Sequence, residues 1–167
     1  MHSIKKSMLS VVLAMLTFLG IIAGTYTVPA AHAAEESTAS EDYHLWRQMD
    51  RRWADVAIGG STIRRSGCLV TSIAILAAHS GTRDPNTFNP GTFANDMSAL
   101  GGFTSGGAIA SWATITQVLP EVRVVDYTSF KSSDQAGKAA EIKARMDQGY
   151  YVVVNVNWHW VFVEGVV

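Results

Sequence analysis

The chain has 167 residues, of which 13 are Lys or Arg and 14 are Asp or Glu, so its formal net charge is −1 at pH 7. A chain this close to neutral, with no basic run, lacks the charge that binds phosphate backbones, so we expect no nucleic-acid partner. Hydrophobic residues make up 48% of the sequence, which is enough for a buried core in one domain.

The N-terminus has the layout of a secretory signal peptide. Lys5 and Lys6 precede an apolar run over residues 8–22, and a small-x-small triplet ends at Ala33. The apolar run is shorter than the roughly 20 residues that a membrane span needs, which disfavours the alternative of a retained anchor. We therefore predict cleavage near Ala33 and a secreted protein without stable membrane insertion. Loss of Lys5 and Lys6 would change the net charge from −1 to −3.

A polar stretch over residues 34–42 predicts a flexible leader, and the folded domain is expected over residues 43–167. Apolar residues at helical spacing predict a buried helix from Cys68 to about Ala78, which Gly81 closes. Further helices are expected over 92–100, 108–119 and 134–148. In the helix over 92–100, Phe93, Met97 and Leu100 should share one face.

Valines at 122, 124 and 125 indicate a strand, and two more strands are expected over 150–156 and 160–167, joined by a tight turn at Asn157 and Trp158. Helices thus come first and strands later. That order predicts an α+β fold in which helices pack on an antiparallel sheet.

Cys68 is the single cysteine of the chain. Exported proteins usually pair their cysteines, so a lone thiol is expected to be either a small buried apolar residue or a reactive group. Its predicted place at the start of a helix favours the second, because free backbone N–H groups and the helix dipole stabilise a thiolate there.

A nucleophilic thiol needs a base, and the five histidines differ in their prospects. Two of them, His2 and His32, lie in the predicted signal peptide, and His44 is expected to be a solvated surface residue. Eleven residues of helix, roughly 16 Å, separate His79 from the thiol, which is too far for a hydrogen bond. His159, at the start of a strand, remains as the candidate base.

Three short motifs together resemble the peptidase family C thirty-nine group, papain-like proteases that include the peptidase domains of bacteriocin-exporting transporters, and especially its free-standing secreted members. The motifs, spread over residues 43–167, are Gln48-x-Asp50-x-x-Trp53, Gly67-Cys68 at the start of an apolar helix, and His159-Trp160-Val161-x-Val163-x-Gly165.

This resemblance implies a papain-like fold and a cysteine hydrolase, expected to be a peptidase that acts on a peptide or protein substrate without a cofactor or metal. It implies that Cys68 is the nucleophile, that His159 is the general base and that the Gln48 amide helps to form the oxyanion hole. Gln48 lies twenty residues before Cys68, a longer interval than in the transporter-attached members.

The resemblance also implies an Asp or Asn that orients the histidine. Glu164 lies five residues after His159, where strand alternation would put it on the opposite face, and Asp126 and Asn155 are possible stand-ins. The sequence stops at Val167 inside an apolar run, from which we expect a C-terminally shortened domain and a weak enzyme.

Two other functions are compatible with the sequence. One is a cell-wall amidase or endopeptidase of the CHAP or NlpC type, which also pairs a cysteine at a helix start with a histidine on a strand. The other is a non-catalytic binding module that keeps the fold and uses exposed tryptophans, for which the candidates are Trp46, Trp53, Trp112, Trp158 and Trp160.

Overall fold

The computed structural model describes residues 41–166, which belong to one compact unit, Thr38–Val167. The predicted signal peptide and most of the predicted leader lie outside the described residues. The chain forms, in order, η1 (Tyr43–Leu45), β1 (Ala57–Ile58), β2 (Ser61–Thr62), α1 (Ile63–Ser66), α2 (Cys68–His79), α3 (Pro90–Ala99), α4 (Trp112–Val118), α5 (Gln135–Asp147), β3 (Val152–Val156) and β4 (His159–Val163).

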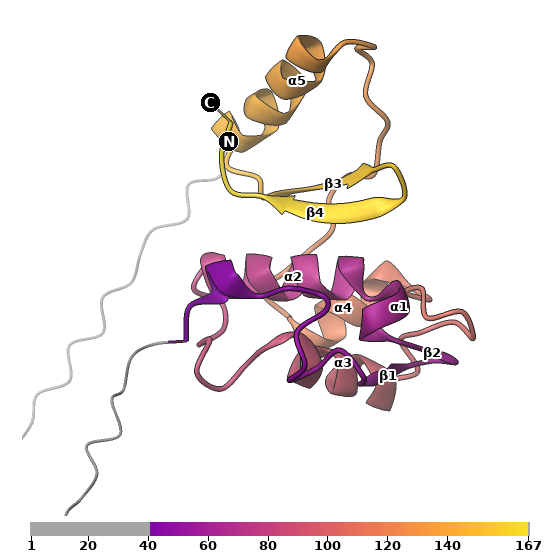
Figure 1. Cartoon of the computed structure of the whole chain (residues 1–167). Coiled ribbons are helices and arrows are strands. Elements are labelled where there is room, and N and C mark those ends of the chain that lie inside the picture. Colours follow the sequence, from indigo (N-terminus) through magenta and orange to yellow (C-terminus); the bar gives the residue numbers. More distant parts are fainter. Residues whose placement is uncertain (1–40, 167) are drawn as a thin grey trace, which may run out of the picture. The chain divides into compact units, whose positions relative to one another are not determined.

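The fold is of the α+β class with small antiparallel sheets, β1 paired with β2 and β3 with β4. The β3–β4 hairpin lies between α2 on one side and α5 on the other, as Figure 1 shows. In the described part of the chain, no helix combines the length and the apolar character that a membrane crossing requires.

The predicted helix at Cys68 is confirmed as α2, which is twelve residues long. Its apolar residues give it a buried face, with Val70, Ile73 and Ala77 in the core. This burial, more than intrinsic propensity, stabilises the helix, because Val, Ile and Thr are only moderate helix formers.

The predicted helix over 92–100 is confirmed as α3, which begins earlier, at Pro90. Asn89 caps it by accepting hydrogen bonds from the N–H groups of Gly91 and Thr92, and the Thr92 hydroxyl accepts in return from the Asn89 N–H. Phe93 and Met97 are fully buried as expected. Leu100 is mostly exposed, contrary to expectation, because the helix ends at Ala99 and its direction is lost there.

The strand predicted at Val122–Val125 is wrong. Residues 122–130 belong to no strand, and the side chains of Val124 and Val125 are exposed. Val122 is bound instead to the end of α4, since its N–H donates to the Leu119 carbonyl and its own carbonyl accepts from the Thr116 hydroxyl. The valines therefore have strand propensity without a partner strand.

The hairpin that carries His159 is found where the sequence predicted it, but the second strand, expected over 160–167, ends at Val163, and residues 164–166 belong to no strand. β3 and β4 pair in antiparallel register from Val156↔His159 to Val152↔Val163. The two turn residues, Asn157 and Trp158, have φ angles of 51° and 67°. Positive φ at both central positions is the signature of a type I′ turn, which matches the twist of a two-residue hairpin.

The hydrophobic core is confined to the N-terminal two thirds of the described chain. Its buried members extend from Trp46 to Leu119 and come from the segment before β1, from β1, from α1 to α4 and from the loop before α3. α5 has no buried residue, and no residue of β3 or β4 is fully buried. The hairpin and α5 thus form a thinly packed layer above a dense helical base.

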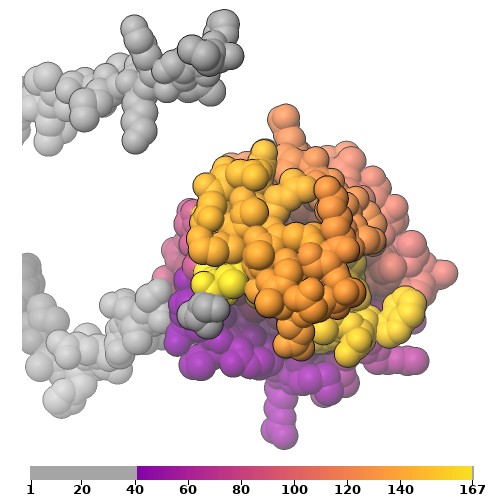
Figure 2. Space-filling model, turned by 90° about the horizontal axis from the view of Figure 1, so that it is seen from above, coloured from indigo at the N-terminus to yellow at the C-terminus, as the bar shows by residue number. Residues whose placement is uncertain are grey.

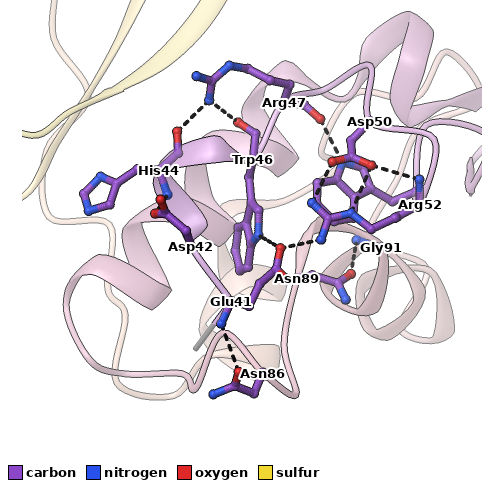
Figure 3. Close-up of polar contacts among 11 residues, drawn as sticks. Glu41, Asp42, His44, Trp46, Arg47, Asp50, Arg52, Asn86, Asn89 and Gly91 are labelled. Carbon is purple, nitrogen blue, oxygen red and sulfur yellow. Dashed lines mark hydrogen bonds and ion pairs between the residues drawn. The ribbon is translucent and has the colours of Figure 1, made fainter. Parts of the chain in front are cut away.

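The segment before β1 is fastened to the core by a small polar network (Figure 3). The Trp46 indole donates to Glu41, and the Arg52 guanidinium contacts both Glu41 and Asp50. Side-chain hydrogen bonds from Arg52 hold the pKa of each of these two carboxyl groups below its ordinary value. Glu41 thus belongs to the folded part of the chain.

Candidate active site

Cys68 is the first residue of α2, and Gly67 makes this position possible. Gly67 is buried at the junction of α1 and α2, where an added Cβ would lie 2.6 Å from the Ile63 Cα and 2.7 Å from the Ile63 carbonyl oxygen. Only glycine fits such a contact with backbone. The first hydrogen bond of the new helix runs from the Thr71 N–H to the Gly67 carbonyl. The N–H groups of the preceding residues, Cys68 included, therefore have no acceptor within α2.

His159 is the first residue of β4, which lies along α2. The Ser72 hydroxyl donates to the Trp160 carbonyl over 3.0 Å and so joins the helix to the outer edge of the strand. Farther along, the Phe162 ring contacts the His79 ring near the end of the helix. Helix and strand thus run in the same direction, which places the first residue of one near the first residue of the other.

Cys68 and His159 line one pocket of about 300 Å³, although 91 positions separate them in the sequence. Gln48 lines the same pocket, as do residues of η1, α2 and β4, among them Tyr43, His44, Arg47, Ser72, Ile75, Trp160, Val161, Phe162 and Glu164. We call this cavity the Cys68 pocket. Since it extends along α2 from Cys68 to Ile75, its length is on the order of 10 Å.

Cys68 and His159 are both accessible to solvent. Cys68 is half-buried and His159 is exposed. The hydrogen bonds among residues 41–166 include none between the two side chains. Reactive pairs without a bound substrate are often looser than a hydrogen bond and tighten in the complex.

Gln48 reaches the pocket, but its amide group is already bound. The Gln48 Nε2 donates to the Ile63 carbonyl over 2.8 Å and to the Arg64 carbonyl over 3.0 Å. A primary amide has two N–H groups, so both are engaged. In this state Gln48 holds the segment before β1 against α1, and donation to an oxyanion would require one of these bonds to break.

The residues that the sequence offered as orienters of His159 have other partners. Asp126 forms an ion pair with Arg145, and the Asn155 Oδ1 accepts from the Trp158 N–H in the hairpin turn. Asn155 pairs across the hairpin with Trp160, so its side chain is on the face opposite to that of His159. Glu164 is bound to a different histidine.

That histidine is His44, which sequence reasoning treated as a plain surface residue. Its Nδ1 lies 3.0 Å from the Glu164 Oε1, and both residues line the Cys68 pocket. Its ring stacks on Tyr43, whose hydroxyl contacts His79 at the far end of α2. The pair therefore lies toward the end of the pocket remote from Cys68. A contact between residues 120 positions apart has no local signal from which it could have been predicted.

The tryptophans proposed as a binding surface divide into two groups. Trp46 and Trp53 are 1% exposed and meet edge to face in the core, so neither can form a binding surface. Trp112 and Trp160 contact each other below the hairpin. Trp158, at the tip of the hairpin, is 95% exposed.

A second cavity, of about 510 Å³, lies on the other side of the hairpin. It is bounded by β3, by α5 and by the irregular segment over residues 125–131, and Figure 2 shows the opening between α5 and that segment. Three of the charged side chains that line it, those of Asp126, Glu141 and Arg145, have local partners. Arg145 pairs with Asp126, and Glu141 accepts from the N–H groups of Lys131 and Ser132.

Within residues 41–166, no group of three or more His, Cys, Asp or Glu side chains is arranged to hold a metal ion. No protein-family model, curated protein or solved structure matches the chain.

Proposed function

We propose that this protein is a secreted cysteine hydrolase, a peptidase of papain-like type, with Cys68 as nucleophile and His159 as general base. The observation that carries the proposal is the shared pocket: the sole thiol, at a helix N-terminus, and an exposed histidine from a distant strand line the same cavity. The resemblance of its motifs to the C thirty-nine group supports the same assignment, and the pattern of residues 1–33 supports export.

In the proposed reaction the Cys68 sulfur attacks the carbonyl carbon of a peptide bond, while His159 takes the thiol proton. The unpaired N–H groups at the start of α2 are suited to stabilise the negative charge that develops on the carbonyl oxygen. His159 then gives its proton to the departing amine, which leaves an acyl-thioester on Cys68. Water, deprotonated by His159, hydrolyses the thioester and restores the thiol.

His159 acts in this scheme without a carboxylate partner from the described residues. Asp126 and Glu164 are engaged elsewhere, and a thiol needs less activation than a serine hydroxyl because some thiolate is present near neutral pH. The proposed site is therefore a dyad, and it should hydrolyse its substrate more slowly than a site with a complete triad.

The test combines chemical labelling with hydrolysis. The protein should react with iodoacetamide at Cys68 and should release fragments from an unfolded protein such as casein. Cys68→Ala should abolish both, and His159→Ala should lower hydrolysis by about 10²-fold to 10⁴-fold, the usual range for loss of a general base.

His44→Ala is the matched control, since His44 is the second histidine of the same pocket but is bound to Glu164. Its hydrolysis should stay within a few-fold of the unmodified protein. A larger loss in His44→Ala than in His159→Ala would assign the base to His44 instead. Unchanged hydrolysis in a folded Cys68→Ala protein would reject the cysteine hydrolase.

A further inference from the structure

Arg47 has a guanidinium group that is held in place without a carboxylate. Its Nη1 donates to the His44 carbonyl over 2.7 Å and to the Trp46 carbonyl over 2.8 Å, and Figure 3 shows the side chain turned away from Arg52. No ion pair in the described part of the chain includes Arg47. Backbone carbonyls therefore fix the position of this charge, and no carboxylate of the described residues is paired with it.

The other arginines among residues 41–166 differ from Arg47. Some form ion pairs with Asp or Glu, namely Arg52, Arg64, Arg83 and Arg145. The rest form neither an ion pair nor a guanidinium hydrogen bond with a described residue, namely Arg51, Arg65 and Arg123. Arg47 is thus the arginine of this part of the chain that combines a fixed guanidinium with an unpaired charge.

The edge of the Arg47 guanidinium that carries Nε and Nη2 forms no hydrogen bond with a described residue. Arg52 and Arg64 use this same edge to bind Asp50 and Asp55, with Nε and Nη2 each donating to the carboxylate. Two N–H donors in one rigid plane match the two oxygens of a carboxylate. The edge that binds carboxylates elsewhere in the molecule is therefore open in Arg47.

Arg47 lines the Cys68 pocket together with the thiol itself. The acidic side chain in the same lining, Glu164, is bound to His44, so the carboxylate that the pocket contains is already engaged. The pocket is on the order of 10 Å long, a distance that about three residues of extended chain span. A substrate group bound to Arg47 would therefore lie within about three residues of the bond that Cys68 attacks.

We propose that Arg47 binds a carboxylate of the peptide substrate, and so selects peptides with an acidic group within about three residues of the scissile bond. This inference rests on the proposed function and adds a substrate preference to it. An acidic side chain and the C-terminal carboxylate of a short peptide present the same pair of oxygens, so the experiment distinguishes these two sources. Arg47 binds substrate in this scheme and takes no part in breaking the bond.

The experiment uses a synthetic library of decapeptides of mixed sequence in two forms, one with both termini blocked and one with a free C-terminus. The full chain digests each form, and mass spectrometry identifies the cleaved bonds. In the blocked form, Asp and Glu should be enriched at least about tenfold over Asn and Gln near the cleaved bond, because a charge-assisted hydrogen bond is stronger than a neutral one. Enrichment of cuts close to a free C-terminus, dependent on Arg47, would support the proposal with the terminal carboxylate as the group bound.

Arg47→Gln should lose the preference for acidic peptides, and Arg47→Lys should keep part of it, because lysine retains the charge without the planar pair of donors. Arg51→Gln is the matched control, since Arg51 is exposed and unpaired but does not line the pocket, and its preference should equal that of the parent. A parent without acidic preference, or a preference that survives Arg47→Gln, would overturn the inference. An equal loss in Arg51→Gln would also overturn it, because overall charge and not Arg47 would then be responsible.

Binding by the Cys68→Ala protein separates this inference from the proposed function. Both forms of the library are passed over immobilised Cys68→Ala protein, with and without Arg47→Gln, and the retained peptides are identified. Retention of acidic or free C-terminal peptides that depends on Arg47, without Cys68-dependent cleavage by the parent, would defeat the function alone. Cys68-dependent cleavage with no preference for a carboxylate would defeat the inference alone, and the absence of both retention and cleavage would overturn both.

Discussion

Gly67 is the residue on which the position of the Cys68 thiol depends most directly. The chain ends α1 and begins α2 at this one glycine, with its Cα packed against the backbone of Ile63. Backbone cannot rotate aside as a flexible side chain can, so any Cβ here must displace one helix relative to the other. Such a displacement would change the position of the thiol relative to β4.

We predict that Gly67→Ala lowers the free energy of unfolding by about 1–3 kcal/mol, the usual range for overpacking, and slows the reaction of Cys68 with iodoacetamide. Urea denaturation and labelling rates measure the two effects. Gly165→Ala is the control, because no atom lies within 4 Å of the Cβ it would add, and its free energy should change by less than about 0.5 kcal/mol. A Gly67→Ala protein of full stability would show that the junction can relax.

Arg52 gives the N-terminal segment a stability that depends on pH. Its hydrogen bonds lower the pKa of Glu41 and of Asp50 in the folded state. A carboxyl group with a lowered folded-state pKa stabilises the fold above its unfolded-state pKa, about 4, and loses that contribution as the pH falls through the folded-state value. The network should therefore be fully effective at neutral pH and fail in acid.

We predict that Arg52→Gln lowers the free energy of unfolding by about 0.5–1 kcal/mol at pH 7, a modest value because solvent screens these partly exposed charges. The difference from the parent protein should shrink progressively below about pH 4. Urea denaturation across pH 2.5–7 measures it. A difference that is the same at every pH would mean that Arg52 acts through its contact with the Trp53 ring and not through the carboxylates.

Helix α2 and strand β4 are the two elements whose alignment forms the candidate site. Strands in a sheet are aligned by a ladder of backbone hydrogen bonds. Helix α2 and strand β4 are joined instead by a hydrogen bond from the Ser72 hydroxyl to the Trp160 carbonyl. Ser72 is buried and lies one turn of helix after Cys68. Trp160 follows His159 directly, so this bond sets the spacing of the thiol and the imidazole.

We predict that Ser72→Ala lowers the free energy of unfolding by about 1 kcal/mol, the typical net value of one hydrogen bond, but lowers casein hydrolysis by tenfold or more because the strand is no longer aligned. Thermal unfolding and turnover are measured together. Ser80→Ala is matched to it, because that hydroxyl bonds only to Ala77 and Thr82 at the end of the same helix. Equal turnover in the two variants would show that packing alone aligns β4.

At the level of elements, the sequence predicted what is encoded locally. The start of α2, helix α3 and the hairpin turn are specified by residues within a few positions of one another, and all were found near their expected places. The strand expected at Val122–Val125 does not form. A run of β-branched residues indicates only an intrinsic preference for extended backbone, whereas a strand also needs a partner strand, which a local sequence pattern does not identify.

The candidate site shows the same limit. Cys68 and His159 could be selected from their chemistry and their places at the start of elements, and their shared pocket follows from the way α2 and β4 align. The bonds from Gln48 to the Ile63 and Arg64 carbonyls, and the pairing of His44 with Glu164, join distant residues. Neither hydrophobic periodicity nor a short motif identifies hydrogen-bond partners that are far apart in the sequence, so these contacts could not be predicted from the sequence.

For the whole molecule, the uneven distribution of burial has a measurable result. Segments with few buried apolar side chains open at a low free-energy cost. We predict that the amide hydrogens of residues 122–150 exchange with deuterium well before those of α2 and α3. Mass spectrometry of samples exchanged at neutral pH measures the two rates. Protection of α5 equal to that of α2 would show that the upper layer is held more firmly than its packing suggests.

The core that ends at Leu119 also divides the tryptophans, and this gives the protein two optical reporters. Trp46 and Trp53 lie inside the core, whereas Trp112, Trp158 and Trp160 lie in or beside the hairpin. If the hairpin unfolded first, the fluorescence emission of the second group would move to longer wavelength, while the emission of Trp46 and Trp53 would stay at the shorter wavelength of buried tryptophan. Fluorescence and far-ultraviolet circular dichroism would then give different midpoints, and a single midpoint fitted to either signal would describe neither layer.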